Sequence, residues 1–187
     1  RTKDQAFSDF EEYCGDYVME TEQLNKQGSG EKLIFANSVN LVLERETGID
    51  FNPNPRMLPT VLDSEKNLKA TLPKWPDGAF PTARNPLALW EVKEFYSSTT
   101  FGSRIADAIY EMMLFGEEVQ TLQEETEQKI DLYLMTDGYE AWKKGVSYIC
   151  RIIDILNMGY IDAAIFGEEV FTQWPDIVNS WEKIPKK

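Results

Sequence analysis

The chain has 187 residues, a net charge of −13, no histidine and an apolar fraction of 42%, which predict a single globular domain and exclude a disordered chain. The absence of histidine excludes Ser-His and Cys-His triads and histidine-ligated metal sites, so any catalysis must use carboxylates, lysine, tyrosine or a bound metal. The acidic balance argues against a simple nucleic-acid binder, although a local basic groove, a metal ion or a partner subunit would still allow a nuclease.

The first part of the chain predicts two helices, over residues 3–26 and 31–46, because apolar residues recur there at three- and four-residue steps. Glycines in residues 27–30 interrupt the pattern between them. The expected inward side chains are Phe7, Phe10, Cys14, Tyr17, Val18 and Leu24 in the first helix, and Leu33, Ile34, Val39, Val42 and Leu43 in the second.

The chain contains two cysteines, Cys14 and Cys150. Each falls on the apolar stripe of a predicted helix, so we expect both to be buried free thiols. Two cysteines without histidine do not suffice for a zinc site.

The middle of the chain predicts strands. Residues 57–62 and 68–72 form two short ones, and residues 87–95 form a longer one. This longer strand is apolar at its start on both faces, which is typical of a central strand covered on both sides.

The C-terminal half alternates helices and strands. Asp137 is expected to cap the helix that begins at residue 139. The alternation predicts an α/β fold, in which a mixed sheet carries helices on both faces. The predicted elements are helices over residues 103–128, 139–157 and 175–183 and strands over residues 130–136 and 163–166. The expected inward side chains are Ile105, Ala108, Ile109, Met112, Met113, Val119 and Leu122 in the first of these helices, and Trp142, Val146, Ile149, Cys150, Ile152, Ile153 and Leu156 in the second.

One pattern of charged residues carries a chemical hypothesis. Pro76 and Asp77 lie in a tight loop, and thirteen residues separate Asp77 from Glu91. Glu91 and Lys93 are two residues apart in a predicted strand, so both side chains point to the same face. A turn that brought Asp77 to them would join two carboxylates and an ammonium group. Such a set suits a divalent cation and an attacking water.

Pro76-Asp77 followed by Glu91-Val92-Lys93 resembles the motif of the PD-(D/E)XK nuclease superfamily, which has the restriction-endonuclease-like fold. The resemblance covers residues 30–171, and its specific part is short. It implies one domain over residues 1–187, with a three-layer core whose central mixed β-sheet is flanked by helices. Residues 1–29 would be an N-terminal helical extension and residues 172–187 a C-terminal helix.

The resemblance also implies roles for the motif. Asp77, Glu91 and the carbonyl of Val92 would ligate Mg²⁺, with Mn²⁺ as the alternative, and Lys93 would orient the water or stabilise the pentavalent transition state. A structural interpretation stands beside this one. Glu91 and Lys93 could form a surface ion pair that contributes ~0–1 kcal/mol, and Asp77 could serve an ordinary turn.

Members of this superfamily often contribute a glutamate from the first core helix. Glu31 is the candidate for that additional ligand, with Glu44 second. The alternative for Glu31 is an acidic residue that interacts with the helix dipole at a helix N-terminus.

A phosphate-binding element is the second addition to the site. Thr100, Ser103 and Arg104 lie at a predicted helix start behind the strand that carries Glu91, where free N–H groups attract phosphate. The alternative is that Ser103 is only an N-cap.

The resemblance implies a hydrolase, a magnesium-dependent endonuclease acting on DNA, of the bacterial restriction or phage-defence type. The alternative is a catalytically silent acidic binding protein, or a DNA mimic, on the same scaffold. A homodimer or a subunit of a larger assembly is also expected, with Trp174 and Trp181 either at an interface or in the core. No run approaches the ~18 apolar residues of a membrane span, so we expect a cytoplasmic protein.

Overall fold

The structure is a computed structural model that describes residues 1–19, 33–47, 51–96 and 103–181. Its helices are α1 (Lys3–Cys14), α2 (Ile34–Thr47), α3 (Ser103–Thr126), α4 (Tyr139–Lys144), α5 (Val146–Asn157) and α6 (Trp174–Trp181), with a short 3₁₀ helix η1 (Gly167–Phe171). Its strands are β1 (Thr60–Leu62), β2 (Leu68–Thr71), β3 (Gly78–Phe80), β4 (Ala88–Glu94), β5 (Asp131–Asp137) and β6 (Ala163–Phe166).

Within the described residues, four strands form the main sheet in the order β3-β4-β5-β6. β3 runs antiparallel to β4, whereas β4, β5 and β6 are parallel. The helix α3 connects β4 to β5, as a parallel pair of neighbouring strands requires. β1 and β2 pair with each other in a separate antiparallel sheet. The prediction of a mixed α/β fold is therefore confirmed.

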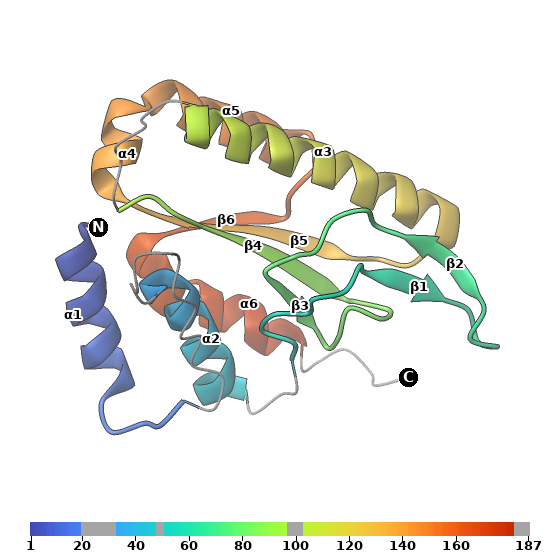
Figure 1. Ribbon diagram of the computed structural model, residues 1–187, viewed down its shortest axis with the longest axis horizontal. Helices are drawn as coiled ribbons and strands as arrows, with labels where there is room; N and C mark the ends of the chain where they lie inside the picture. Colours follow the sequence, from blue (N-terminus) through green and yellow to red (C-terminus); the bar gives the residue numbers. More distant parts are fainter. Residues whose placement is uncertain (20–32, 48–50, 97–102, 182–187) are drawn as a thin grey trace.

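Helices cover both faces of the main sheet. In Figure 1, α3 and α5 lie over one face and α2 and α6 over the other, so the molecule has three layers. On the α3 face, Leu89 of β4 packs in the same apolar cluster as Met112 of α3. On the other face, Trp90 packs with Trp174 and Trp181 of α6, which are 0% and 3% exposed. The two tryptophans therefore belong to the core.

The central position of β4 explains its composition. Ala88, Leu89 and Trp90 are all buried, because helices cover both sides of the strand. The strand predicted over residues 87–95 is confirmed with nearly the same limits, and the strand 163–166 is confirmed with the same limits. None of the helices in the described part of the chain is both long and apolar enough to cross a membrane.

The first helix is shorter than predicted. α1 ends at Cys14, because the chain turns at Gly15, whose φ of 54° lies in the left-handed region that favours glycine. Its apolar stripe is not a core face either. Phe7 is 41% exposed and Val18, beyond the helix, is 84% exposed, so the predicted burial of both is wrong. Leu24 and the rest of residues 20–32 lie outside the described residues.

The helix predicted over residues 139–157 is two helices, α4 and α5, separated at Gly145. The break gives α5 its own orientation, in which Ile152 and Ile155 are buried while Val146 and Ile153 are exposed. Met113 of α3 is also exposed rather than inward.

Both cysteines are free, as predicted, but neither is fully buried. Cys14 is partly buried and Cys150 is exposed. The sequence pattern misplaced them because α1 and α5 present narrower apolar faces to the core than the spacing of apolar residues indicated.

Candidate active site

Glu91 and Lys93 lie on the face of β4 that α3 covers. Lys93 Nζ is 3.2 Å from Glu91 Oε2 and 3.0 Å from Oε2 of Glu111, which α3 supplies. Lys74, from the segment between β2 and β3, contacts Glu91 Oε1 and lies 3.3 Å from Glu111 Oε1. We call Lys74, Glu91, Lys93 and Glu111 the charge cluster. Its two ammonium groups balance its two carboxylates.

The carboxylate of Glu91 is the buried centre of the charge cluster. Its side chain is 1% exposed, whereas those of Lys74 and Lys93 are each 21% exposed. The interpretation of Glu91 and Lys93 as an ion pair on an exposed strand is therefore wrong. Removing charges from water is costly unless close partners compensate, and here two ammonium groups do so.

Asp77 immediately precedes β3, and the β3–β4 register brings it to the charge cluster. Gly78 pairs with Trp90, so the antiparallel register places Asp77 opposite Glu91. The main chain of Asp77 donates to Trp90 O at 3.0 Å, and its Oδ2 accepts the N–H of Val92 at 2.7 Å. The hairpin thus brings Asp77 to the strand that carries Glu91 and Lys93, as the sequence hypothesis required.

The local charges shift the pKa values of these groups in different directions. Burial, together with the nearby Asp77, raises the pKa of Glu91 above its usual range, and the two lysines offset only part of this. Burial alone would lower the pKa of Lys93, but the Glu91 and Glu111 carboxylates outweigh it and raise that pKa. Lys93 therefore carries its charge at neutral pH, and it can stabilise an anion but cannot act as a general base.

Carboxylate oxygens are the ligands that Mg²⁺ prefers, and Mg²⁺ is commonly held by one or two carboxylates together with water. Asp77 and Glu91 fit that donor set. Among the described residues, no group of three or more acidic, cysteine or histidine side chains is arranged to hold a metal ion. The donor chemistry fits a two-carboxylate magnesium site. One oxygen of that site, Glu91 Oε1, is already in contact with the ammonium group of Lys74.

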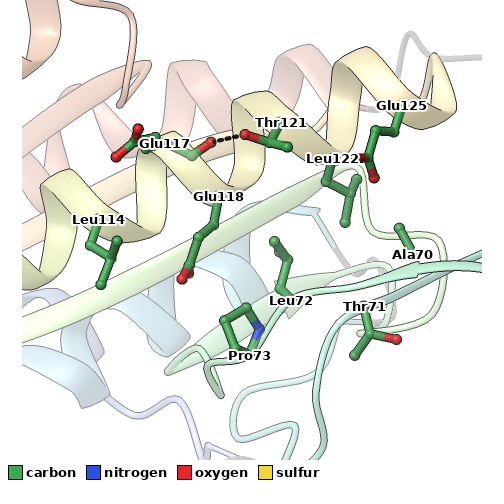
Figure 2. Close-up of a pocket in the computed structure, with 10 residues that line it drawn as sticks. All are labelled: Ala70, Thr71, Leu72, Pro73, Leu114, Glu117, Glu118, Thr121, Leu122 and Glu125. Atoms are coloured by element: carbon green, nitrogen blue, oxygen red, sulfur yellow. Dashed lines mark hydrogen bonds between the residues drawn. The ribbon is translucent and has the colours of Figure 1, made fainter.

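A groove of about 510 Å³ lies between β2 and α3 (Figure 2). Its lining continues from the charge cluster, because Pro73 precedes Lys74 and Leu114 follows Glu111 by one helical turn. Three glutamates of α3 also line it, at positions 117, 118 and 125. Burial and the neighbouring Glu117 raise the pKa of Glu118. The groove therefore repels phosphate and suits a cationic or apolar group.

Comparison with known proteins places the whole described region in one family. A family model described as "Domain of unknown function (DUF7687)" matches residues 1–181. The chain belongs to the DUF7687 family. No curated protein and no solved structure matches the chain.

The remaining predicted site residues are not part of the charge cluster. Glu31 and Thr100 lie outside the described residues. Ser103 begins α3, and Arg104 is exposed in the first turn of that helix. No hydrogen bond or ion pair among the described residues connects Arg104 to the charge cluster. Glu44 is partly buried on α2, which covers the face of the sheet opposite to α3 and the charge cluster.

The sequence hypothesis missed Lys74 and Glu111. Lys74 could have been suspected because it lies three residues before Asp77 in the same loop. Glu111 had no local signal, since its position depends on how α3 packs across β4. Burial alone would raise the pKa of Glu111, but Lys93 and Lys74 lower it.

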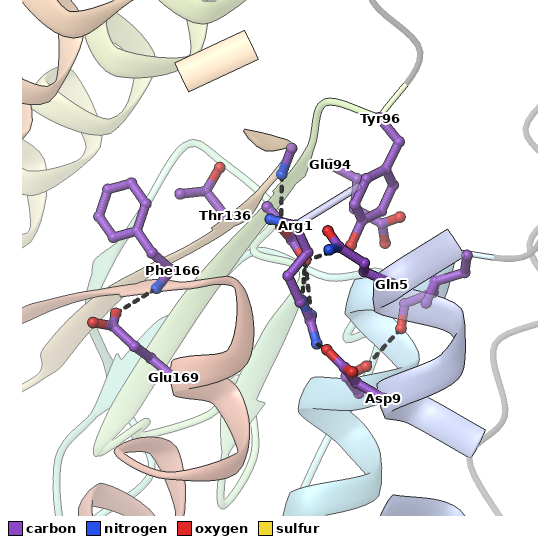
Figure 3. Close-up of polar contacts among 12 residues, drawn as sticks. Arg1, Gln5, Asp9, Glu94, Tyr96, Thr136, Phe166 and Glu169 are labelled. Atoms are coloured by element: carbon purple, nitrogen blue, oxygen red, sulfur yellow. Dashed lines mark hydrogen bonds and ion pairs between the residues drawn. The ribbon is translucent and has the colours of Figure 1, made fainter. Parts of the chain in front are cut away.

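A second polar cluster lies on the opposite face of the sheet, near the ends of β4 and β5 (Figure 3). Asp137 is 2% exposed and accepts hydrogen bonds from the Tyr96 hydroxyl at 2.6 Å and the Arg1 guanidinium at 2.8 Å. Glu94 Oε1 accepts the N–H of Ala36, in the first turn of α2, at 2.9 Å. The prediction that Asp137 caps α4 is wrong, because other groups hold its carboxylate and α4 has no side-chain cap.

Proposed function

We propose that this DUF7687 protein is a metal-dependent endonuclease that hydrolyses DNA phosphodiester bonds, of the restriction or phage-defence type. One observation carries the proposal: a buried glutamate, Glu91, lies beside Lys93 and opposite Asp77. Apolar side chains would fill this side of β4 at lower free-energy cost than a cluster of charges. A catalytic role therefore explains the charges of Glu91 and Lys93 at this position better than a contribution to stability does.

The topology supports the same proposal. The restriction-endonuclease-like core has the order helix, three strands, helix, strand. Here α2 is followed by the β3–β4 hairpin, α3 and β5. Asn52 forms an isolated antiparallel bridge with Ala79 of β3. This bridge lies before the hairpin in the chain, where the restriction-endonuclease-like core would have the first of its three strands. The chain departs from the restriction-endonuclease-like order in one respect, because the separate β1–β2 sheet lies between Asn52 and β3 in the sequence.

The proposed roles follow from the geometry of the side chains. Asp77 and Glu91 would hold Mg²⁺, with Mn²⁺ as a substitute, and the Val92 carbonyl is the proposed third protein ligand. When bound, the ion would activate a water and neutralise charge on the phosphate. Lys93 remains protonated and would stabilise the charge that develops on the phosphate oxygens.

The second candidate function is an acidic binding protein or DNA mimic on the same scaffold. The net charge of −13 and the glutamate-lined groove beside α3 favour it. An acidic binder has no need for a buried Glu91 with lysine partners, because a mimic presents its carboxylates to solvent. Metal binding at Asp77 and Glu91 distinguishes the two functions.

The proposal is tested by plasmid cleavage at low salt with Mg²⁺, Mn²⁺ or EDTA. The proteins compared are the wild type, Asp77→Ala, Glu91→Gln and Lys93→Ala, with Asp154→Asn as a control on the exposed surface of α5. We expect metal-dependent cleavage by the wild type and the control, and its loss in the other three variants. Circular dichroism verifies that each variant is folded.

The absence of both cleavage and calorimetrically detectable metal binding in the wild type would overturn the nuclease proposal and favour the acidic binding protein. A homodimer or a larger assembly that supplies a basic surface remains part of the proposal. Sedimentation velocity of the wild type with and without DNA tests this part.

A further inference from the structure

Lys74 is the member of the charge cluster that the motif does not include. Its ammonium group contacts Glu91 Oε1 and lies 3.3 Å from Glu111 Oε1. It also lies 5.4 Å from the centre of the Phe115 ring, within the range of a cation–π contact. A strand and a helix therefore present two carboxylates and an aromatic ring to one cation.

The two lysines that contact Glu91 differ in how they are supported. Lys93 belongs to β4 itself, two residues from Glu91, so the strand fixes its backbone. Lys74 belongs to the segment between β2 and β3, outside regular secondary structure. Its long side chain can change rotamer without moving a strand. A rotation of the Lys74 side chain therefore removes its ammonium group from Glu91 without moving β4.

We propose that the Lys74 ammonium group takes the place of a divalent cation on Glu91 in the metal-free protein and is displaced from Glu91 when the cation binds. This inference rests on the proposed metal site. Glu111 then keeps Lys74 close to the site, because its Oε1 faces the same ammonium group. Lys74 thereby adds to the compensation that Lys93 gives the buried charge of Glu91 when no metal is present.

A purely structural role for Lys74 predicts different behaviour. A structural ion pair would persist at saturating metal, and its removal would weaken or leave unchanged the binding of Mg²⁺. Displacement requires competition, so removing the competitor must strengthen binding. Lys69 provides a matched control, because it lies near Lys74 in sequence and pairs with Asp63 on the surface at 3.3 Å.

The experiment is calorimetric titration of MgCl₂, and separately MnCl₂, into the wild type, Lys74→Met, Lys74→Arg and Lys69→Met. We expect the Kd of Lys74→Met to fall about tenfold, equivalent to about 1.4 kcal/mol. Lys74→Arg and Lys69→Met should stay within about twofold of the wild type. The charge-conserving variant thus separates competition from loss of packing.

A second measurement uses only the folded wild type. Lysine-selective ¹⁵N NMR detects ammonium groups whose hydrogens are held by ion pairs, and Lys74→Arg assigns the signal. We expect the Lys74 signal in EDTA and its loss or shift at saturating MgCl₂. A signal that stays unchanged while metal binds would overturn the displacement, and this readout remains valid if Lys74→Met fails to fold.

The outcomes also separate this inference from the proposed function. If the wild type binds Mg²⁺ and Lys74→Met binds it equally or more weakly, the displacement is wrong and the metal site stands. If Lys74→Met binds and the wild type does not, the competition is supported and the wild-type nuclease is not. If neither protein binds Mg²⁺ or Mn²⁺, the displacement of Lys74 and the proposed metal site are both wrong.

Discussion

The Lys93 ammonium group lies 3.0 Å from Glu111 Oε2, so an ion pair joins the central strand β4 to the helix α3 that covers it. The same ammonium group is 3.2 Å from Glu91 Oε2. Lys93 is therefore held between two carboxylates, and its position depends on the packing of α3 as well as on the strand. This arrangement restricts the orientations available to its charge.

Replacing Lys93 by methionine should lower the rate of plasmid cleavage about 10²–10³-fold, the usual cost of losing one preorganised charge at a developing anion. Mg²⁺ binding should persist, because Asp77 and Glu91 remain. Single-turnover cleavage and calorimetry measure the two effects separately. Lys93→Arg is the control that keeps the charge, and it should recover part of the rate. Equal losses of cleavage and metal affinity in Lys93→Met would contradict an electrostatic role.

Asp77→Asn should weaken Mg²⁺ binding at least about tenfold, because the neutral amide is a poorer ligand than a carboxylate. The free energy of unfolding should change by less than about 1 kcal/mol, since Asp77 is exposed. The amide oxygen of the variant can still accept the hydrogen bond that Val92 donates. Calorimetry and urea denaturation measure the two quantities, with Asp154→Asn as the control. Unchanged metal affinity would exclude Asp77 as a ligand.

The longer and central elements could be predicted from the sequence because burial on two faces leaves a clear pattern. The sequence predicts β4 and β5 in this way, since each is seven residues long and lies between two other strands. It does not predict β3, since three residues, Gly78–Phe80, are too short for periodicity and lie beside prolines. That short strand nevertheless sets the register of Asp77 against Glu91.

The candidate site could be predicted only in part. Asp77, Glu91 and Lys93 share a short sequence pattern, so their proximity could be expected from a turn and a strand. Glu111 reaches Lys93 through packing between a helix and the sheet, and the sequence alone does not specify which turn of α3 faces β4. Local sequence patterns therefore identified Asp77, Glu91 and Lys93 but missed Glu111, which the helix layer contributes.

Gly78 should tolerate no side chain, because the indole of Trp90 occupies the position of its Cβ. Trp90 cannot move freely, since it packs against Trp174 at a centroid distance of 5.9 Å. We expect Gly78→Ala to lower the free energy of unfolding by about 1–3 kcal/mol, as overpacking does. It should also weaken Mg²⁺ binding, because the hairpin positions Asp77.

A double-mutant cycle with Trp90→Leu, measured by urea denaturation, tests the cause. Gly78→Ala should cost less in the Trp90→Leu background, where the clashing ring is absent. An equal cost in both backgrounds would show that the indole is not the reason for glycine at this position.

Glu94 should make stability depend on pH. Burial raises the pKa of Glu94 from its ordinary value of 4.5 to about 7, although the N–H groups at the start of α2 partly oppose this. Between these values the folded state binds the proton more tightly than the unfolded state. The contribution of Glu94 is therefore fully present below about pH 4.5 and is lost as the pH rises through 7. The loss is at most about 3.5 kcal/mol, because each pKa unit corresponds to 1.36 kcal/mol.

Glu94→Gln removes this titration and keeps an oxygen that accepts the N–H of Ala36. Urea denaturation of the wild type and the variant at pH 5, 6, 7 and 8 gives the difference in their free energies of unfolding. That difference should shift in favour of Glu94→Gln as the pH rises, because only the wild type must then bury a charge. Glu140→Gln, on the exposed surface of α4, is the control and should show no such trend. A constant difference across the four pH values for Glu94→Gln would mean that Glu94 keeps an ordinary pKa despite its burial.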